Sequence, residues 1–229
     1  MKLSIIIPCY NEQNTISLVI DKILSSYTAE KEIIVIDDCS NDKTSDILKN
    51  DLKNKIDKLI LNPRNYGKGY SVRKGINAAE GDIILIQDAD LEYDPSDYIK
   101  LIKPIEKGIA DVVYGTRFLG GEEKRVLYFW HTLGNKFLTI FSNMFSNLNL
   151  TDMEVGYKLF KSSIIKDINL IEDRFGFEPE VTAKIAKKKI RIFEVGIGYY
   201  GRKYEDGKKI TWKDGISAIR CIIKYNLFN

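Results

Sequence analysis

Residues 83–92 read Ile-Ile-Leu-Ile-Gln-Asp-Ala-Asp-Leu-Glu. The four apolar residues form a run typical of a buried strand, and two carboxylates, Asp88 and Asp90, follow it at once. Side chains two positions apart on extended backbone point to the same side. Both carboxylates can therefore hold one Mg²⁺ or Mn²⁺ ion while that ion binds two phosphate oxygens. An Asp-x-Asp taken alone is better explained by a solvated acidic turn, but its place directly after a strand favours the metal site.

The same strand-then-polar pattern recurs through the first half of the chain. Apolar runs predict strands at residues 3–7, 33–36, 58–61, 83–86 and 112–114, and apolar periodicity predicts helices at 15–26, 43–52, 70–79 and 95–107. This alternation implies an α/β fold with a mostly parallel central sheet flanked by helices. Ligands of such sheets bind at the carboxyl ends of the strands. The polar residues that follow the strands are therefore the candidate site residues.

The second half of the chain is less regular. Strands are predicted at 157–160 and 191–195, and a final helix at 212–225. Between residues 125 and 148, apolar side chains recur at helical spacing: Val126, Phe129, Trp130, Leu133, Phe137, Ile140, Phe141, Met144, Phe145 and Leu148. Such a stripe fits either a core-facing helix or a helix lying on a bilayer. No linker composition interrupts the chain, so residues 1–229 are predicted to form one domain, with a functional join near Gly115.

Composition narrows the classes of function. The chain has 35 Lys and Arg against 32 Asp and Glu, a net charge of +3 that predicts no nucleic-acid partner. Three cysteines without metal-ligand spacing predict neither disulfides nor zinc and favour a reducing, cytoplasmic location. The single histidine, His131, leaves carboxylates as the expected metal ligands. The first eight residues are too short for a signal peptide, and no run approaches the roughly 20 apolar residues of a membrane span, so membrane contact is expected to be peripheral.

Acidic residues follow the second predicted strand. Asp37 and Asp38 can accept hydrogen bonds from a base or a ribose. Capping of the next helix is the alternative, but it accounts for Ser40 and Asp42 and leaves the two aspartates without a role.

A polar turn, Pro8-Cys9-Tyr10-Asn11-Glu12, follows the first predicted strand. Tyr10 can stack on a base, and Asn11 and Glu12 can bind the nucleoside. A simple strand-to-helix turn explains the same residues.

The glycine-containing segment Asn62-Pro63-Arg64-Asn65-Tyr66-Gly67-Lys68-Gly69 follows the third strand. It has neither the Gly-x-Gly-x-x-Gly spacing of dinucleotide-binding folds nor the lysine motif of P-loop enzymes. Redox dinucleotide binding and P-loop NTPase activity are therefore not expected.

Taken together and in order, these segments resemble the family 2 glycosyltransferases, and most nearly the branch of dolichol-phosphate mannose synthases and other polyprenyl-phosphate glycosyltransferases. The resemblance covers nearly the whole chain. It rests on Pro8–Glu12, Asp37-Asp38, Asn65–Gly69, Asp88-Ala89-Asp90, Gly115-Thr116-Arg117, Thr151-Asp152, Gly201-Arg202 and Gly207-Lys208-Lys209.

The resemblance implies a glycosyltransferase A-type fold and inverting transfer of a hexose from a GDP- or UDP-sugar to a polyprenyl phosphate. Residues 1–115 would bind the nucleotide sugar and residues 116–229 the acceptor. Asp88 and Asp90 would hold the metal with Glu92 close by, and Asp38 would contact the base. The implied nucleotide-sugar-binding set is Pro8, Tyr10, Asn11, Glu12, Asp37, Asp38, Lys68, Asp88, Ala89, Asp90, Arg202, Lys208 and Lys209.

The implied catalytic residues are Asp90, Arg117, Asp152 and Arg202. Arg202 and Lys209 would neutralise the diphosphate, and Arg117 would face the acceptor phosphate. Asp152 is the candidate base or acceptor-orienting carboxylate, with a plain turn residue as the alternative.

Two departures from the family pattern bear on the acceptor. His131 lies in Trp130-His131-Thr132-Leu133-Gly134-Asn135, where lipid-phosphate synthases more often carry an arginine, and the C-terminal motif reads Gly-Lys-Lys-Ile in place of Gly-x-Ser-Lys. A glycan hydroxyl therefore stays open as an alternative acceptor, and a non-catalytic nucleotide-sugar-binding subunit as an alternative from another class. A lipid acceptor would place the protein at the cytosolic face of a membrane.

Overall fold

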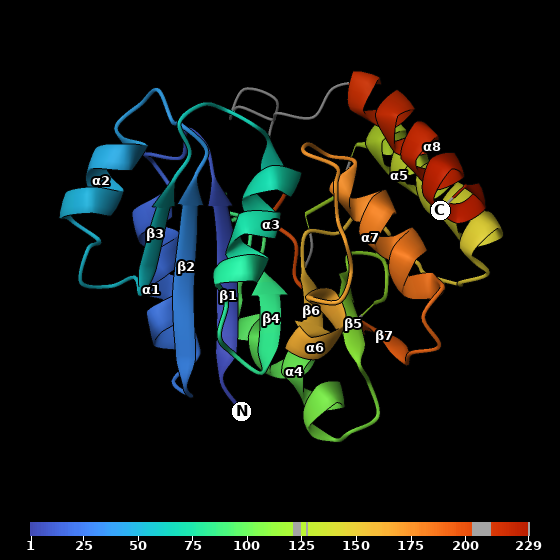
Figure 1. The fold of residues 1–229 in the computed structure, drawn as a ribbon, viewed down its shortest axis with the longest axis horizontal. Coiled ribbons are helices and arrows are strands. Elements are labelled where there is room, and N and C mark those ends of the chain that lie inside the picture. The colour runs from blue at the N-terminus through green and yellow to red at the C-terminus, as the bar shows by residue number, and fades with distance from the viewer. Residues whose placement is uncertain (121–124, 127, 203–211, 229) are drawn as a thin grey trace.

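The computed structural model of the chain describes residues 1–120, 125, 126, 128–202 and 212–228. One seven-stranded sheet in the order β3-β2-β1-β4-β6-β5-β7 runs through it (Figure 1). The strands are β1 (Leu3–Cys9), β2 (Lys31–Asp37), β3 (Lys58–Leu61), β4 (Ile83–Ile86), β5 (Val112–Thr116), β6 (Lys158–Lys161) and β7 (Ile192–Gly196). β6 is antiparallel to both of its neighbours, and the other strand pairs are parallel. The predicted α/β fold with a mostly parallel sheet is confirmed.

Helices cover both faces of the sheet; α3 lies in front of it in Figure 1 and α1 behind it. They are α1 (Ile16–Ser26), α2 (Thr44–Asn50), α3 (Lys68–Ala78), the 3-10 turn η1 (Pro95–Asp97), α4 (Tyr98–Glu106), α5 (Phe129–Ser146), α6 (Ser162–Ile165), α7 (Phe177–Ala186) and α8 (Trp212–Leu227). The helices and strands predicted from sequence are present within a few residues of their expected bounds. Helices α6 and α7 were not predicted.

Helix α7 escaped prediction because polar residues interrupt the apolar ones on its buried surface. Glu178, Glu180 and Thr182 are all buried, so the usual apolar periodicity of a core-facing helix is interrupted. Buried carboxylates need partners, and two of these three side chains carry charge into the centre of the molecule. Helix α7 therefore contributes buried carboxylates as well as packing contacts.

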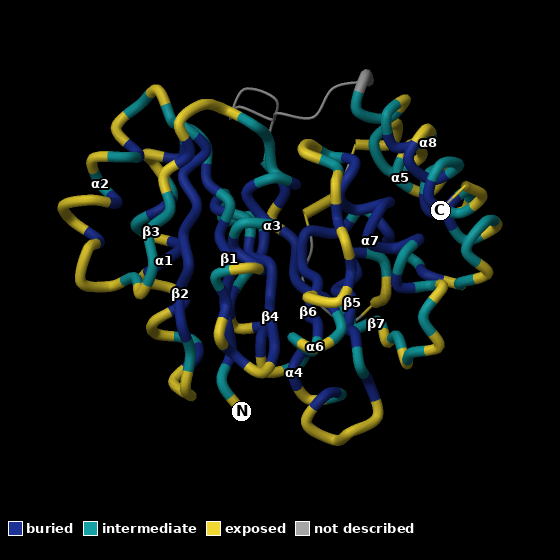
Figure 2. Tube along the Cα trace, viewed as in Figure 1, coloured by how far each residue is buried: buried dark blue, intermediate teal, exposed yellow. Residues whose placement is uncertain are grey.

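The inner strands β1, β2, β4, β5 and β6 form the buried centre of the molecule, as Figure 2 shows, whereas the edge strands β3 and β7 are mostly half-buried. Gln87, directly after β4, is completely buried, and its Oε1 accepts hydrogen bonds from the hydroxyls of Tyr98 and Tyr157, both at 2.6 Å. A buried amide with two partners fixes the backbone from which it extends. The acidic turn that follows Gln87 is thus anchored to the sheet at its first residue.

Candidate active site

The acidic turn after β4 is sharply bent. Leu91 adopts a left-handed backbone conformation with φ of 62°, and the Glu92 N–H donates to Asp90 Oδ1 at 3.1 Å. Ala89, between the two aspartates, is buried at 4% exposure, while Asp88 and Asp90 are half-buried. The turn therefore presents both carboxylates from a fixed, short segment at the carboxyl end of β4.

Asp88 is held from two sides. Its Oδ1 lies 2.8 Å from Lys68 Nζ, and its Oδ2 lies where a Cβ on Gly156 would be only 2.1 Å away. No side chain fits at position 156 without displacing the carboxylate. The loop after β3, the turn after β4 and the segment before β6 therefore meet at Asp88.

Lys68 owes its place to the glycines beside it. A Cβ on Gly69 would lie 2.3 Å from the carbonyl oxygen of Glu172, and one on Gly67 would lie 2.6 Å from that of Asp173. Because neither position has a side chain, the segment before α7 packs directly on the start of α3. Glu178, the second residue of α7, places its Oε1 3.1 Å from Lys68 Nζ. Lys68 thus lies between two carboxylates, one from the turn and one from α7.

The turn suits a divalent cation in its donor chemistry. Burial, then the charges of Asp88 and Glu92, raise the pKa of Asp90 from 3.8 to about 8. Crowded carboxylates of this kind are stabilised by a cation, and oxygen ligands suit Mg²⁺ and Mn²⁺. Among the described residues, no group of three acidic, histidine or cysteine side chains is arranged as a complete metal cage. Asp88 and Asp90 are the residues that would hold such a cation, which would supply positive charge for a diphosphate.

Glu92 accepts two hydrogen bonds from the segment that carries Arg202, and its place among the metal ligands stays a prediction. Its Oε1 accepts the Arg202 N–H at 2.7 Å, and its Oε2 accepts the Tyr199 hydroxyl at 2.8 Å. Glu92 therefore ties the acidic turn to the segment that carries Arg202.

Arg202 joins the first loop to the acidic turn. Its Nε donates to the carbonyl oxygen of Asp90 at 2.9 Å, and its guanidinium lies 2.7 Å from the carboxylate of Glu12. Glu12 and Arg202 are 190 positions apart in the sequence, so their pairing could not be found from spacing. The structure thus brings two predicted nucleotide-sugar residues to the acidic turn.

The loops after β1 and β2 are hydrogen-bonded to each other. Asn11 accepts the Asn41 N–H through Oδ1 at 2.7 Å, and the Tyr10 hydroxyl lies 3.3 Å from Asn41 Nδ2. Pro8 is half-buried near the end of β1. The predicted nucleoside residues therefore line one continuous edge formed by two adjacent parallel strands.

The two aspartates after β2 are buried and fully engaged. Asp37 Oδ1 accepts the Ser40 hydroxyl at 2.5 Å, and Asp38 accepts the N–H groups of Tyr66 at 3.0 Å and Gly67 at 2.7 Å. Asp38 also accepts from Asn62 Nδ2 at 2.7 Å. In this structure Asp38 holds the segment that carries Lys68, and its contact with a base stays a prediction.

The two residues predicted for the acceptor step form a pair. The Arg117 guanidinium grips Asp152 in a two-pronged ion pair, with Nε–Oδ2 at 2.6 Å and Nη2–Oδ1 at 2.7 Å. Arg117 is 7% exposed and Asp152 0%. Asp152 therefore holds the Arg117 guanidinium in place, and its role as a base or an acceptor-orienting carboxylate stays a prediction.

Sequence reasoning missed a third residue, a glutamate, that helps to hold this arginine–aspartate pair. Glu194, on β7, accepts the backbone N–H groups of Thr151 at 2.8 Å and Asp152 at 3.2 Å. It therefore holds the turn from which Asp152 extends. The signal was an acidic residue flanked by apolar residues inside a predicted strand.

His131 lies near the start of α5, half-buried beside the same region. Together with Arg125, Tyr199 and Arg202 it lines a small hollow, so the predicted acceptor residue and a predicted diphosphate residue share one surface. Lys208 and Lys209, both predicted to bind the nucleotide sugar, lie outside the described residues.

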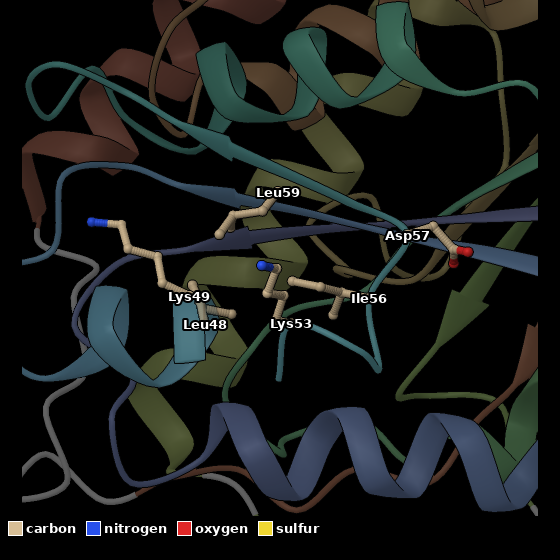
Figure 3. A pocket seen from close by; sticks show the side chains of 6 residues that line it. All are labelled: Leu48, Lys49, Lys53, Ile56, Asp57 and Leu59. Carbon is tan, nitrogen blue, oxygen red and sulfur yellow. The ribbon is translucent and has the colours of Figure 1, made fainter. Parts of the chain in front are cut away.

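A second hollow lies between α2 and β3, away from these residues (Figure 3). Its lining is formed by Leu48, Lys49, Lys53, Ile56, Asp57 and Leu59. None of the site residues predicted from sequence is among them, so this hollow is separate from the candidate site.

Residues 4–168 match the model of the family described as glycosyl transferase family 2. The chain belongs to this family. The predicted family is thus confirmed, and so is the resemblance to polyprenyl-phosphate glycosyltransferases, because curated members of that group are among its relatives.

Two relatives illustrate this group. The undecaprenyl-phosphate 4-deoxy-4-formamido-L-arabinose transferase of Photorhabdus laumondii is 29% identical over 213 residues, which cover 90% of this chain and 62% of the relative. The dodecaprenyl-phosphate galacturonate synthase of Rhizobium johnstonii is 24% identical over 212 residues, covering 89% and 60%. The chain thus spans about three fifths of the length of these two relatives.

The fold is shared with solved family structures. Glucosyl-3-phosphoglycerate synthase of Mycobacterium tuberculosis superposes with a TM-score of 0.76 at 18% identity, over 100% of this chain and 82% of that one. Its complex with Mn²⁺ and UDP-glucose gives a TM-score of 0.76 at 17% identity, over 98% and 79%. At this identity the likeness establishes the fold, which is the predicted glycosyltransferase A-type.

Proposed function

We propose that this family 2 glycosyltransferase moves a hexose from a nucleotide-diphosphate sugar to a polyprenyl phosphate with inversion at the anomeric carbon. The nucleotide sugar binds to residues 1–115 and Arg202, and the acceptor binds to residues 116–229. The observation that favours a lipid acceptor over a soluble glycan is the exposed apolar face of α5, which begins beside His131.

The donor residues suit departure of a nucleoside diphosphate. Negative charge grows on the oxygen that leaves the anomeric carbon, and stabilisation of that charge is the main task of the site. A divalent cation bound by Asp88 and Asp90 supplies charge neutralisation when present. When the nucleotide sugar binds, the Arg202 guanidinium leaves its ion pair with Glu12 and binds phosphate oxygens. Its planar array of N–H donors can pair with either group.

The acceptor side suits a phosphate nucleophile. A phosphate oxygen is already anionic and needs little help from a base. It attacks the anomeric carbon as the bond to the diphosphate breaks. Arg117 supplies the positive charge that attracts it, and Asp152 holds the guanidinium in place.

The apolar face of helix α5 points to solvent. Of its 18 residues, all of which the structure describes, the fully buried ones are Thr139 and Ser142. Phe129 is 69% exposed and Trp130 78%. The exposed apolar side chains share one face, at Phe129, Trp130, Leu133, Phe137, Ile140 and Met144. These six side chains therefore do not pack in the core, whereas Leu148, at the end of the predicted stripe, packs against it.

Helix α8 extends this surface. It packs against α5 (Figure 1) and exposes Ile216 and Leu227, with Phe228 just beyond its end. An exposed apolar surface of this extent marks an interaction site, and peripheral binding at the cytosolic face of a membrane would bring a lipid phosphate to the site. Among the described helices, none has the length and apolarity needed to cross a bilayer.

Replacing Phe129 and Trp130 together by serine should abolish sedimentation with anionic liposomes. The melting temperature should change little, because both side chains are mostly exposed and fill no core space. A liposome pelleting assay beside a melting scan measures both effects. The matched control is Ile99→Ser, an exposed apolar residue on α4 at 62% exposure. Wild-type protein that never pellets with liposomes would contradict membrane binding.

The proposed reaction is tested by transfer of radiolabelled sugar in detergent. Label from a UDP- or GDP-hexose should enter the organic phase when undecaprenyl or dolichyl phosphate is present, and soluble oligosaccharides should accept far less. Preference for the oligosaccharide would support a glycan hydroxyl as acceptor. Donor binding without transfer to either would point to a non-catalytic subunit. The relatives' names include a neutral sugar and a galacturonate, so they leave the sugar open.

A further inference from the structure

Tyr199 lies between the donor and acceptor residues of the site. It is 4% exposed, and its hydroxyl donates to Glu92 Oε2 at 2.8 Å. The Cζ atom of Arg117 lies 5.2 Å from the centre of its ring, a distance at which a cation and an aromatic ring attract each other. One buried side chain therefore contacts the acidic turn through its hydroxyl and the arginine predicted for the acceptor step through its ring.

The Arg117 guanidinium is held by more than its ion pair. Its edge binds Asp152, and two aromatic rings lie beside it, with ring centres 5.2 Å from Cζ for Tyr199 and 5.7 Å for Phe118. A planar guanidinium stacks well on aromatic rings. Phe118 is the next residue in the chain, whereas Tyr199 comes from the segment after β7. Tyr199 therefore relates the guanidinium to a separate part of the fold.

The segment that carries Tyr199 is bound to the acidic turn. The carbonyl oxygen of Glu92 accepts the Tyr200 N–H at 2.9 Å, and its carboxylate accepts the Tyr199 hydroxyl and the Arg202 N–H. Burial, then the charge of Glu92, raise the pKa of the Tyr199 hydroxyl above its ordinary value of 10.0, so the hydroxyl remains a donor at neutral pH. Tyr199 therefore has a fixed position relative to Asp90, whose carbonyl oxygen accepts from Arg202 Nε.

The reaction proposed above depends on alignment. Direct displacement requires the attacking oxygen, the anomeric carbon and the leaving oxygen to lie nearly in line, and a misplacement of about 1 Å can cost about a hundredfold in rate. The leaving oxygen belongs to the diphosphate at the acidic turn, and the attacking oxygen belongs to the phosphate that Arg117 attracts. Tyr199 joins these two places through one side chain, and it lines the small hollow shared by His131 and Arg202.

We propose that Tyr199 is a positioning residue that sets the Arg117 guanidinium relative to the acidic turn, so that the acceptor phosphate attacks in line with the bond to the diphosphate. This inference rests on the proposed glycosyltransfer to a lipid phosphate. Tyr199 acts through Arg117 and Glu92 and touches no reacting atom. Replacing a tyrosine that only filled space would change the stability of the fold without changing the alignment of the two substrates.

Replacing Tyr199 in two ways separates its hydroxyl from its ring. Tyr199→Phe keeps the ring beside Arg117 and loses the hydrogen bond to Glu92, whereas Tyr199→Leu loses both contacts. Steady-state kinetics use the UDP- or GDP-hexose and the undecaprenyl or dolichyl phosphate that the wild type accepts. Transfer to the lipid and hydrolysis of the donor by water are measured side by side.

Tyr199→Phe should lower kcat for transfer about tenfold and change the KM for the lipid phosphate by less than about twofold, because Arg117 still binds the phosphate but is misplaced. The ratio of transfer to donor hydrolysis should fall by a similar factor, since water needs no alignment by Arg117. Tyr199→Leu should in addition raise the KM for the lipid phosphate about fivefold, because the guanidinium loses its aromatic neighbour.

Tyr225→Phe is the matched control. Tyr225, on α8, is 0% exposed, and its hydroxyl donates to a carboxylate, that of Glu172, at 2.7 Å. The substitution removes the same kind of buried hydrogen bond away from the acidic turn. Its melting temperature should fall as that of Tyr199→Phe does, while its ratio of transfer to hydrolysis stays at the wild-type value. Tyr199→Phe, which removes a single oxygen atom, decides the matter if Tyr199→Leu does not fold.

Three results would contradict the inference, and they are distinct. A wild-type kcat and a wild-type ratio of transfer to hydrolysis in Tyr199→Phe would overturn it and leave glycosyltransfer standing. An equal fall of transfer and hydrolysis, with a lower melting temperature, would make Tyr199 a structural residue only. A wild type that binds UDP or GDP but transfers sugar to neither lipid phosphate removes the proposed acceptor and the role of Tyr199 with it.

Discussion

Asp90→Asn should reduce sugar transfer at least about a hundredfold, equivalent to about 2.7 kcal/mol of transition-state stabilisation. The substitution removes one of two carboxylates able to hold the cation beside the diphosphate. Titration of the wild type with nucleoside diphosphate should show metal-dependent binding that EDTA abolishes, and the variant should bind weakly in both conditions. Asp51→Asn, exposed at the end of α2, is the control. Equal affinity of the wild type with and without EDTA would exclude the metal assignment.

The same variant should gain stability in the absence of metal. Burial and the neighbouring carboxylates raise the pKa of Asp90 to about 8 in the folded chain, from its ordinary 3.8. Between those values the folded state holds a proton that the unfolded state releases, so the free energy of unfolding falls as the pH rises from about 4 to about 8. Asparagine has no such titration. Melting scans should therefore show the variant equal to wild type near pH 4 and above it near pH 8, with added Mn²⁺ stabilising the wild type alone.

Arg117→Ala should abolish transfer and also lower the free energy of unfolding by about 3–5 kcal/mol, because it leaves Asp152 charged, buried and unpaired. Urea denaturation measures the loss. Removing both partners in Arg117→Ala/Asp152→Ala should recover part of that stability, since the uncompensated charge is gone. Transfer should not recover with it.

The double variant separates a structural role from a functional one. Hydrolysis of the donor by water should survive in it, because water makes no contact with the acceptor residues. Recovery of transfer to lipid phosphate in the double variant would show that Arg117 acts only by compensating Asp152.

The sequence was sufficient for those parts of the fold where local pattern and burial agree. Ile83–Ile86 is fully buried as its apolar run requires, and the turn beginning at Asp88 follows it at the carboxyl edge of the sheet. Turn geometry and strand order place the candidate loops together, because parallel strands end at one edge. These relations depend on residues near one another in the chain.

Partners that are distant in the sequence could not be predicted, because their pairing is not a local relation. The match of Arg202 to Glu12 and of Arg117 to Asp152 depends on how distant segments are brought together, which no local period encodes. Helix α5 shows a related limit. Its period indicated a helix, but the direction of its apolar face is set by the inward packing of Thr139 and Ser142.

Strand β6 lies in the middle of the sheet, between β4 and β5, although it follows both of them in the sequence. During synthesis β4 and β5 leave the ribosome more than 40 residues before β6 can pair with them. Until then, one edge of β4 and both edges of β5, whose other neighbour β7 is made later still, present unsatisfied N–H and C=O groups, which readily pair with other chains. A nascent chain arrested after residue 116 is accordingly a substrate for chaperones and prone to aggregate. We therefore expect residues 1–116 to be unstable when produced as a separate fragment.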